Sequence, residues 1–303
     1  MPDPELSVIV TIVDAGAALD RCLTAIAAQQ NVAAAALEVI VPWDASVPDR
    51  PLLERRFPQF RFLEMESRSA KTPAAQHEVF DRRRAFGLAA ARGKLVAILE
   101  DRGVPRPDWA RAFLQAHAAR PAAVIGGAIE NGRDAVLNWA VYFCDFGRYQ
   151  LPYEEGPRPY VSDVNVCYRR EALEKTRALW RDRYHETTVH WALLEAGDIL
   201  WLSAAPVVDQ QRDKLVLSQL LVERRDWGRL FAYTRVNNAG LGRRAGLAVI
   251  SPLLPFVLLA RMAAARIGKG NSLGKFVVAM PAAFLLLVAW CYGELLGYVT
   301  AKP

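Results

Sequence analysis

The feature that most constrains the fold is a repeated alternation of short apolar runs and amphipathic stretches. The runs "LSVIVTIV" (residues 6–13) and "LEVIV" (37–41) have the continuous, β-branched composition of strands buried on both faces. Apolar runs also predict strands at 60–64, 95–100, 122–130 and 198–203, with helices at 74–92, 108–117 and 185–197. Such alternation predicts an α/β fold with a mostly parallel sheet and right-handed crossovers.

The same alternation indicates where a ligand would bind. In an open parallel sheet, ligands bind beyond the carboxyl ends of the strands. Asp14, Asp44 and the segment Glu100–Pro105 each follow a predicted strand. We therefore expect them on one rim of the sheet, where carboxylates and a cation would meet.

The C-terminal segment has a different composition. Its two charge-free runs are Ala245–Ala260 and Phe276–Gly293. At about 1.5 Å per residue the first covers roughly 24 Å, short of a hydrocarbon core of about 30 Å. It contains prolines and has basic residues on both sides, which disfavours a crossing under the positive-inside tendency. We expect a re-entrant or interfacial helix at 245–262 and a transmembrane helix at 276–298, although two spanning helices also fit.

The composition limits the classes of molecule that the protein is expected to bind. The net charge of +6 fits an anionic partner, but no motif that reads a nucleic-acid groove is visible, so we expect no nucleic acid. The four cysteines form no Cys-x-x-Cys pair, which excludes a zinc site of that type. The domains expected are residues 1–238, a soluble α/β domain, and 239–303, a membrane-associated helical segment.

Three segments resemble family 2 glycosyltransferases. They are "SVIVTIVDAGAALDRCLTAIAAQ", "LEVIVPWDAS" and "RRRAFGLAAARGKLVAILEDRGVPRPDW", in the order of the family's elements. The resemblance covers roughly residues 6–235. It implies the GT-A fold, a Rossmann-like sheet flanked by helices, and transfer of a sugar from a nucleoside-diphosphate donor to an acceptor.

The resemblance also implies a cation at the end of the fourth strand. Aligned on Pro105, the family's acidic triplet falls on Glu100, Asp101 and Arg102. Glu100 and Asp101 are then the expected ligands of Mg²⁺ or Mn²⁺, which would neutralise the leaving diphosphate. Arg102 replaces the acid that holds the metal most directly. Three readings fit: Arg102 turns outward, or binds the diphosphate through its planar guanidinium, or makes an ordinary strand-end ion pair.

Further donor-binding residues follow from the same alignment. Asp44 falls on the second acid of a turn that meets the base and ribose, and Trp43 replaces the first acid, where it would stack on the base. Arg84 falls on an arginine three residues before Gly87 and would pair with a phosphate. The remaining expected donor residues are Asp14, on the same rim, and Asn165, in a segment resembling the family's pocket-lining Gly-Asn-x-x-x-Arg.

A direct displacement also needs a base near the acceptor hydroxyl. Glu186, in "HETTVH", falls where the family has an acid at the start of a helix, and Asp163 is the second candidate for the base. A zinc-protease reading of this segment fails, because His185 and His190 are five residues apart instead of four. In "ERRDWGR" only Trp227 matches the Gln-x-x-Arg-Trp motif, which argues against a processive synthase.

The sequence therefore predicts a bacterial-type glycosyltransferase at the inner (cytoplasmic) membrane, with its catalytic domain in the cytoplasm. Its expected partners are a nucleotide-sugar donor, a lipid-linked or polysaccharide-precursor acceptor, and membrane lipids. The alternative is a catalytically weak GT-A-like subunit that binds or assembles within a polysaccharide-synthesising complex. Arg102 and Trp43, which replace expected acids, keep that alternative open.

Overall fold

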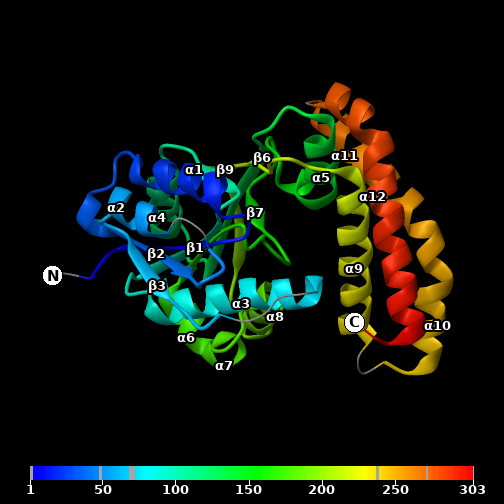
Figure 1. Cartoon of the computed structure of the whole chain (residues 1–303), viewed down its shortest axis with the longest axis horizontal. Helices are drawn as coiled ribbons and strands as arrows, with labels where there is room; N and C mark the ends of the chain where they lie inside the picture. The colour runs from blue at the N-terminus through cyan, green and yellow to red at the C-terminus, as the bar shows by residue number, and fades with distance from the viewer. Residues whose placement is uncertain (1–2, 48–49, 68–71, 237–238, 271, 303) are drawn as a thin grey trace. The chain divides into compact units, whose positions relative to one another are not determined.

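A computed structural model describes residues 3–47, 50–67, 72–236, 239–270 and 272–302. The chain divides into two compact units (Figure 1). We call residues 1–69, 78–132 and 149–211 the α/β unit, and residues 70–77, 133–148 and 212–303 the helical unit. The predicted boundary at residue 238 lies outside the described residues, and the helical unit already takes up the chain from residue 212.

A single nine-stranded sheet organises the α/β unit, in the order β3-β2-β1-β4-β8-β6-β9-β5 with β7 paired to β9. Strands β1, β2, β3 and β4 are parallel neighbours, which puts their carboxyl ends on one rim. The strands are β1 (Leu6–Thr11), β2 (Leu37–Trp43), β3 (Arg61–Glu64), β4 (Leu95–Glu100), β5 (Gly103–Pro105), β6 (Val124–Asn131), β7 (Gly156–Pro157), β8 (Asn165–Arg169) and β9 (Leu200–Gln210).

Helices cover both faces of this sheet (Figure 1). Alternate residues of β1, such as Val8 and Val10, share a core with α1, α2 and α4. Ile9 points to the other face, where it lies so close to Gly87 of α3 that no side chain fits there. The helices are α1 (Gly16–Ala27), α2 (Arg50–Arg56), α3 (Pro73–Ala90), α4 (Trp109–Ala119), α6 (Arg170–Lys175), α7 (Arg177–Trp180) and α8 (Glu186–Glu195), with a 3₁₀ turn at Ala34–Ala36.

The structure confirms the α/β class, and it adds a reversal that the alternation did not predict. Strand β8 runs antiparallel to both β4 and β6, so the sheet is mixed. The aromatic stretch 131–160, for which no regular element was predicted, contains helix α5 (Val136–Asp145) and the 3₁₀ turn Gly147–Tyr149. Four consecutive residues of α5, from Ala140 to Phe143, are buried, which explains the apolar composition of this stretch.

The helical unit consists of α5, α9 (Leu217–Val236), α10 (Leu241–Ile250), α11 (Leu254–Lys269) and α12 (Leu273–Thr300). A 3₁₀ turn, Ser251–Leu253, joins α10 to α11 into one continuous helical stretch. The stretches Leu241–Lys269 and Leu273–Thr300 are each long and apolar enough to cross a membrane. The first is longer than the predicted helix at 245–262.

Candidate active site

Arg84 of α3 links the end of β4 to the segment before β8. Its Nη2 lies 2.8 Å from Glu100 Oε1 and 2.8 Å from Asp163 Oδ2, and its Nη1 lies 3.1 Å from Asp81 Oδ1. Burial alone would lower the pKa of Arg84, but the three acids hold it above its usual range. Burial likewise raises the pKa of Glu100, against the opposing effect of Arg84. The arginine is therefore a fixed cation that keeps two separate carboxylates together.

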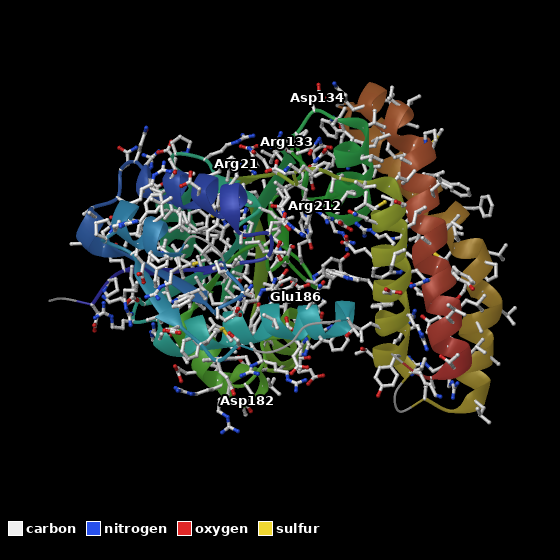
Figure 2. All side chains as sticks on the ribbon, in the orientation of Figure 1. Arg21, Arg133, Asp134, Asp182, Glu186 and Arg212 are labelled. Atoms are coloured by element: carbon white, nitrogen blue, oxygen red, sulfur yellow. The ribbon has the colours of Figure 1, made fainter. Side chains whose placement is uncertain are left out.

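Glu186 is the next group in this chain of contacts. It occupies the first turn of α8 (labelled in Figure 2) and accepts a 2.7 Å hydrogen bond from the backbone N–H of Asp163. Burial and the neighbouring Asp163 raise the pKa of Glu186 well above its usual range. A half-buried acid held in this way is suited to exchanging a proton.

Asp101 holds the loop between β1 and α1. Its carboxylate accepts the backbone N–H of Ala15 at 2.7 Å and that of Asp14 at 3.1 Å. Ala15 has φ 58° and ψ −158°, a conformation that glycine favours, and the carboxylate stabilises this backbone. Because the group is only 1% exposed, burial raises the pKa of Asp101 to about 7, although these N–H bonds oppose the shift.

Arg102 is engaged with the same loop. Its Nε lies 2.9 Å from Asp14 Oδ2 and its Nη2 lies 2.6 Å from Asp14 Oδ1, a bidentate ion pair. Of the three sequence-based readings, the strand-end ion pair is the one seen. Two of the five N–H donors of this guanidinium face a carboxylate, so a diphosphate would have to replace Asp14 to bind along the same Nε–Nη2 edge.

Asp44 directly follows β2, and both of its carboxylate oxygens accept hydrogen bonds from protein groups. Its Oδ2 accepts a 2.8 Å hydrogen bond from Arg83 Nη2, and its Oδ1 accepts the backbone N–H of Ser46 at 2.8 Å. Burial would raise the pKa of Asp44, but Ser46 and Arg83 hold it below its usual value. The side chain of Trp43 is buried beside it, with the Arg50 guanidinium 3.9 Å from the ring centre.

Asn165 lies apart from these groups, in the core. Its Oδ1 accepts a hydrogen bond from Trp109 Nε1 at 2.8 Å, and its Nδ2 donates to the carbonyls of Ala128 and Pro206. The residue is fully buried. The structure therefore brings together Arg84, Glu100 and Glu186, and in a second set Asp14, Asp101 and Arg102, but it places Asn165 among packing side chains.

A family comparison agrees with this geometry. The model of the family "Glycosyl transferase family 2" matches residues 7–177, more than half of the chain. This chain belongs to glycosyl transferase family 2. The protein is thus a glycosyltransferase, and the matched range contains all of the rim residues described above except Glu186. Among curated proteins, none matches the chain in sequence.

Solved structures of glycosyltransferases share the fold of this family 2 transferase. A mannosyltransferase from Pyrobaculum calidifontis, solved with GDP-Man and Mn²⁺, matches with a TM-score of 0.58 and 16% identity over 95% of this chain and 87% of its own. Residues 1–349 of TarS from S. aureus, solved with UDP-GlcNAc, match with a TM-score of 0.52 and 12% identity over 92% of this chain and 79% of theirs. Both confirm the predicted GT-A fold.

The transferase's own residues offer little to a divalent cation. Among the described residues, no group of three or more His, Cys, Asp or Glu side chains is arranged to hold a metal. Of the two predicted ligands, Asp101 is turned to backbone N–H groups and Glu100 to Arg84. A metal ligand must present free oxygen lone pairs, so these carboxylates do not fit a metal in the arrangement described.

Two charged residues of the transferase's site, Arg83 and Asp81, were missed in the sequence. Arg83 binds Asp44, and Asp81 pairs with both Arg84 and His185. The i, i+3 spacing of Asp81 and Arg84 was a usable signal for their pairing. Asp163 was expected only as a second candidate for the base. Its contacts with Arg84 and Glu186 have no mark in the sequence, because they depend on the antiparallel strand β8 that follows it.

Proposed function

We propose that the protein transfers a glycosyl group from a nucleoside-diphosphate donor to a lipid-linked or polysaccharide-precursor acceptor at the cytoplasmic membrane face. The observation that carries this proposal is the chain of contacts Glu100–Arg84–Asp163–Glu186. It joins the carboxyl end of β4, where an open sheet binds its ligand, to the strongest candidate for a base. Donor and acceptor chemistry would then meet at one rim.

In this proposal Glu186 takes the acceptor proton. The acceptor oxygen attacks the anomeric carbon, the bond from that carbon to the diphosphate oxygen breaks, and the acceptor proton passes to the Glu186 carboxylate. A raised pKa makes the deprotonated form of Glu186 a stronger base for this proton. Arg84 pairs with Asp163 and so holds the Asp163 backbone N–H that bonds to Glu186.

Donor binding is assigned to the rim around β1, β2 and β4. We place the nucleotide near Asp44 and Trp43, and the diphosphate near Asp14, Glu100 and Arg102. The charged side chains among them already have partners: Arg83 for Asp44, Arg84 for Glu100, and Asp14 and Arg102 for each other. A donor would exchange some of those pairs for its own hydroxyl and phosphate groups. Asp101 serves by holding the loop after β1, and Asn165 by positioning Trp109 beneath the site.

A divalent cation, Mg²⁺ or Mn²⁺, remains the expected cofactor of the family resemblance, and the mannosyltransferase neighbour was solved with Mn²⁺. The residues present here do not fit it, so no step of the mechanism is derived from it. We propose instead that guanidinium groups neutralise the leaving diphosphate. Arg102 is the leading candidate, because its planar fork already holds a carboxylate by two bonds and suits a phosphate equally.

The alternative, a catalytically weak GT-A-like binding or assembly subunit, rests on one observation. Arg102 occupies the position of an expected acid and closes onto Asp14, which leaves the strand end self-paired. A subunit of that kind would bind nucleotide sugar, a membrane or a partner protein without turnover.

One experiment separates the two. The purified full-length protein is screened for thermal stabilisation by a panel of UDP-, GDP- and dTDP-sugars, and each donor that binds is then incubated with a lipid extract from bacterial membranes. The proposal predicts release of nucleoside diphosphate together with a glycosylated lipid or precursor. Donor binding without any release, across the panel and several extracts, would support the binding subunit instead.

A further inference from the structure

Helix α12 is packed on one side along its whole length by segments that carry charges. Near its start, Phe276 stacks edge-on against Phe143 of α5, and Lys275 pairs with Asp134 (labelled in Figure 2) at 2.6 Å. Near its middle, the Cys144 thiol of α5 lies 3.8 Å from the carbonyl oxygen of Ala283. These contacts lie inside the helical unit and place α5 beside the first half of α12.

The second half of α12 lies against α9. Gly228 of α9 and Gly293 and Gly297 of α12 leave no room for a Cβ, because each meets the backbone of the opposite helix. The contacts pair Arg225 with Gly293 and Ala232 with Gly297, so the two helices run side by side in the same direction. Close packing of this kind fixes α9 against the apolar helix instead of leaving it as a separate linker.

Helix α9 is a charged helix. Its charged residues are Glu223, Arg224, Arg225, Asp226, Arg229 and Arg235. Arg224 is buried and makes two hydrogen bonds to Asp145, 2.5 and 2.6 Å long, next to the cysteine that contacts Ala283. A full ion pair therefore lies beside the middle of α12.

The positions of these charged residues along α12 are incompatible with a crossing of the hydrocarbon core. Only seven residues of α12 separate Lys275, which pairs with Asp134, from Ala283, which contacts the cysteine next to Asp145. At about 1.5 Å per residue they cover roughly 11 Å, whereas a hydrocarbon core is about 30 Å thick. If α12 crossed the membrane, the Arg224–Asp145 pair and the charges of α9 would have to enter lipid with it, at a high desolvation cost.

The opposite side of these helices is apolar and exposed. On α12 the exposed residues Val277, Val278, Leu285, Val288, Tyr292 and Val299 recur at helical spacing on one face. On α10 and α11 the exposed apolar residues include Val249, Leu253, Phe256, Val257 and Ile267. We call this set the apolar face of the helical unit.

The charge around the apolar face is almost entirely positive. From residue 241 to the C-terminus the chain contains seven basic residues and one acid, Glu294. That acid is buried, where it accepts hydrogen bonds from Trp290 and Tyr298. An exposed apolar face with basic residues around it matches the surface of an anionic lipid leaflet.

We propose that α10, α11 and α12 lie along the membrane surface, with the apolar face inserted into one leaflet, and that neither long apolar helix crosses the bilayer. The inference rests on the proposed membrane location and replaces the expected transmembrane helix at 276–298. The chain would then be held on the face where its active site works, and a lipid-linked acceptor would reach the site from the same leaflet.

The test determines the side on which the turn between α11 and α12 lies. Gly268 is exposed with open space around it, so Gly268→Cys should fold normally. The matched control is Glu195→Cys, an exposed position at the end of α8 in the α/β unit. Both are made in a Cys144→Ala background, which removes the half-buried native thiol. A membrane-impermeant maleimide is applied to spheroplasts and to inverted membrane vesicles of a bacterium that expresses the full chain.

Surface attachment predicts that both cysteines react in inverted vesicles and that both are protected in spheroplasts until detergent is added. Labelling of Gly268→Cys in spheroplasts, with Glu195→Cys protected, would show that the hairpin crosses and would overturn the inference. Protection of Gly268→Cys in both preparations would place the turn inside the bilayer and would also overturn it. If the protein stays soluble and does not sediment with phosphatidylglycerol vesicles, the proposed membrane location itself fails, while donor turnover can still be measured.

Discussion

Arg84 in the α/β unit and Arg224 in the helical unit are both buried arginines that meet carboxylates, but they do so in different settings. Arg84 is surrounded by three acids from three segments, Asp81, Glu100 and Asp163. Arg224 meets one acid, Asp145, whose side chain is 27% exposed. A buried cluster of charges is a poor source of stability, because desolvation offsets most of the Coulombic attraction.

The difference suggests two uses of the same residue type. In the α/β unit, charges are buried with one another at the rim where a ligand binds, which favours a chemical role. In the helical unit, charges lie on one side and apolar residues on the other, which favours an interface between water and lipid. If this comparison is right, the two arginines should differ in what fails when each is removed.

Arg84→Met should have the largest effect. Removing the cation takes away the guanidinium that Asp81, Glu100 and Asp163 share, and breaking a buried pair typically costs about 3–5 kcal/mol. We expect a loss of that order in the free energy of unfolding, measured by chemical denaturation, together with loss of detectable transfer. Arg177→Met is the control, because its partner Glu174 and Arg177 itself are exposed and such pairs contribute about 0–1 kcal/mol. A stable, active Arg84→Met would contradict the role given to the cluster.

His117 tests burial of a polar group without an opposite charge. It is 3% exposed and donates from Nε2 to the carbonyl of Cys167, and burial lowers its pKa to about 4. In the unfolded chain His117 takes up a proton near pH 6.5, whereas in the folded chain it does so only near pH 4. The free energy of unfolding should therefore fall as the pH drops from about 6.5 to 4. The slope should be up to about 1.4 kcal/mol per pH unit.

His117→Gln keeps a donor for the carbonyl and removes the titration. Denaturation curves of both proteins at pH 7, 6 and 5 should therefore converge as the pH falls. Parallel pH dependence of the two proteins would mean that His117 takes up its proton in the folded state.

Arg224→Met should have an intermediate effect confined to the helical unit. The partly exposed Asp145 can be rehydrated, so we expect a loss of about 1–3 kcal/mol in the free energy of unfolding. Transfer to a short, water-soluble acceptor should remain within a few-fold of wild type. A loss of transfer as complete as that of Arg84→Met would remove the distinction between the two arginines.

The sequence predicted the α/β core well, because its strands are continuous apolar runs that no helix period matches. It also placed Asp14, Glu100, Asp101 and Arg102 on one rim, since parallel strands bring their carboxyl ends together. It did not predict the reversal of β8, whose five residues carry no mark of direction. The link between Asp163 and Glu186 depends on that reversal and was therefore not predicted.

The ion-pair partners of the rim residues could not be predicted from the sequence either. Asp44 and Arg83 are 39 residues apart, and Arg102 and Asp14 are 88 apart, so their partners follow from strand order and not from local spacing. Asn165 was predicted to line the pocket from its place at a strand end, whereas the sequence could not predict the three core partners of its amide. The charge-free C-terminal runs were correctly recognised, and their long helices follow from that composition.

Arg102→Lys should have the smallest effect. Lysine keeps the charge but cannot hold both oxygens of Asp14, or a phosphate, through a planar fork. We expect a few-fold loss of transfer, seen most clearly in EDTA, with some wild-type activity surviving chelation. The measurement is transfer rate against free Mn²⁺ for the two proteins. If wild type has no transfer activity in EDTA, and Arg102→Lys has the same transfer rate as wild type in Mn²⁺, then a metal neutralises the diphosphate and Arg102 does not.

The central claim is that Glu186 is the base of a glycosyl transfer, and a matched pair of variants tests it most directly. Glu186→Gln keeps the shape of the side chain and removes its basicity, whereas Glu195→Gln changes an exposed residue at the other end of the same helix. With the donor found by the screen, transfer rate and donor affinity are measured for both. If Glu186 is the base, Glu186→Gln binds donor like wild type and loses transfer by about 10²-fold or more, and Glu195→Gln changes neither. Transfer by Glu186→Gln within a few-fold of wild type would contradict it.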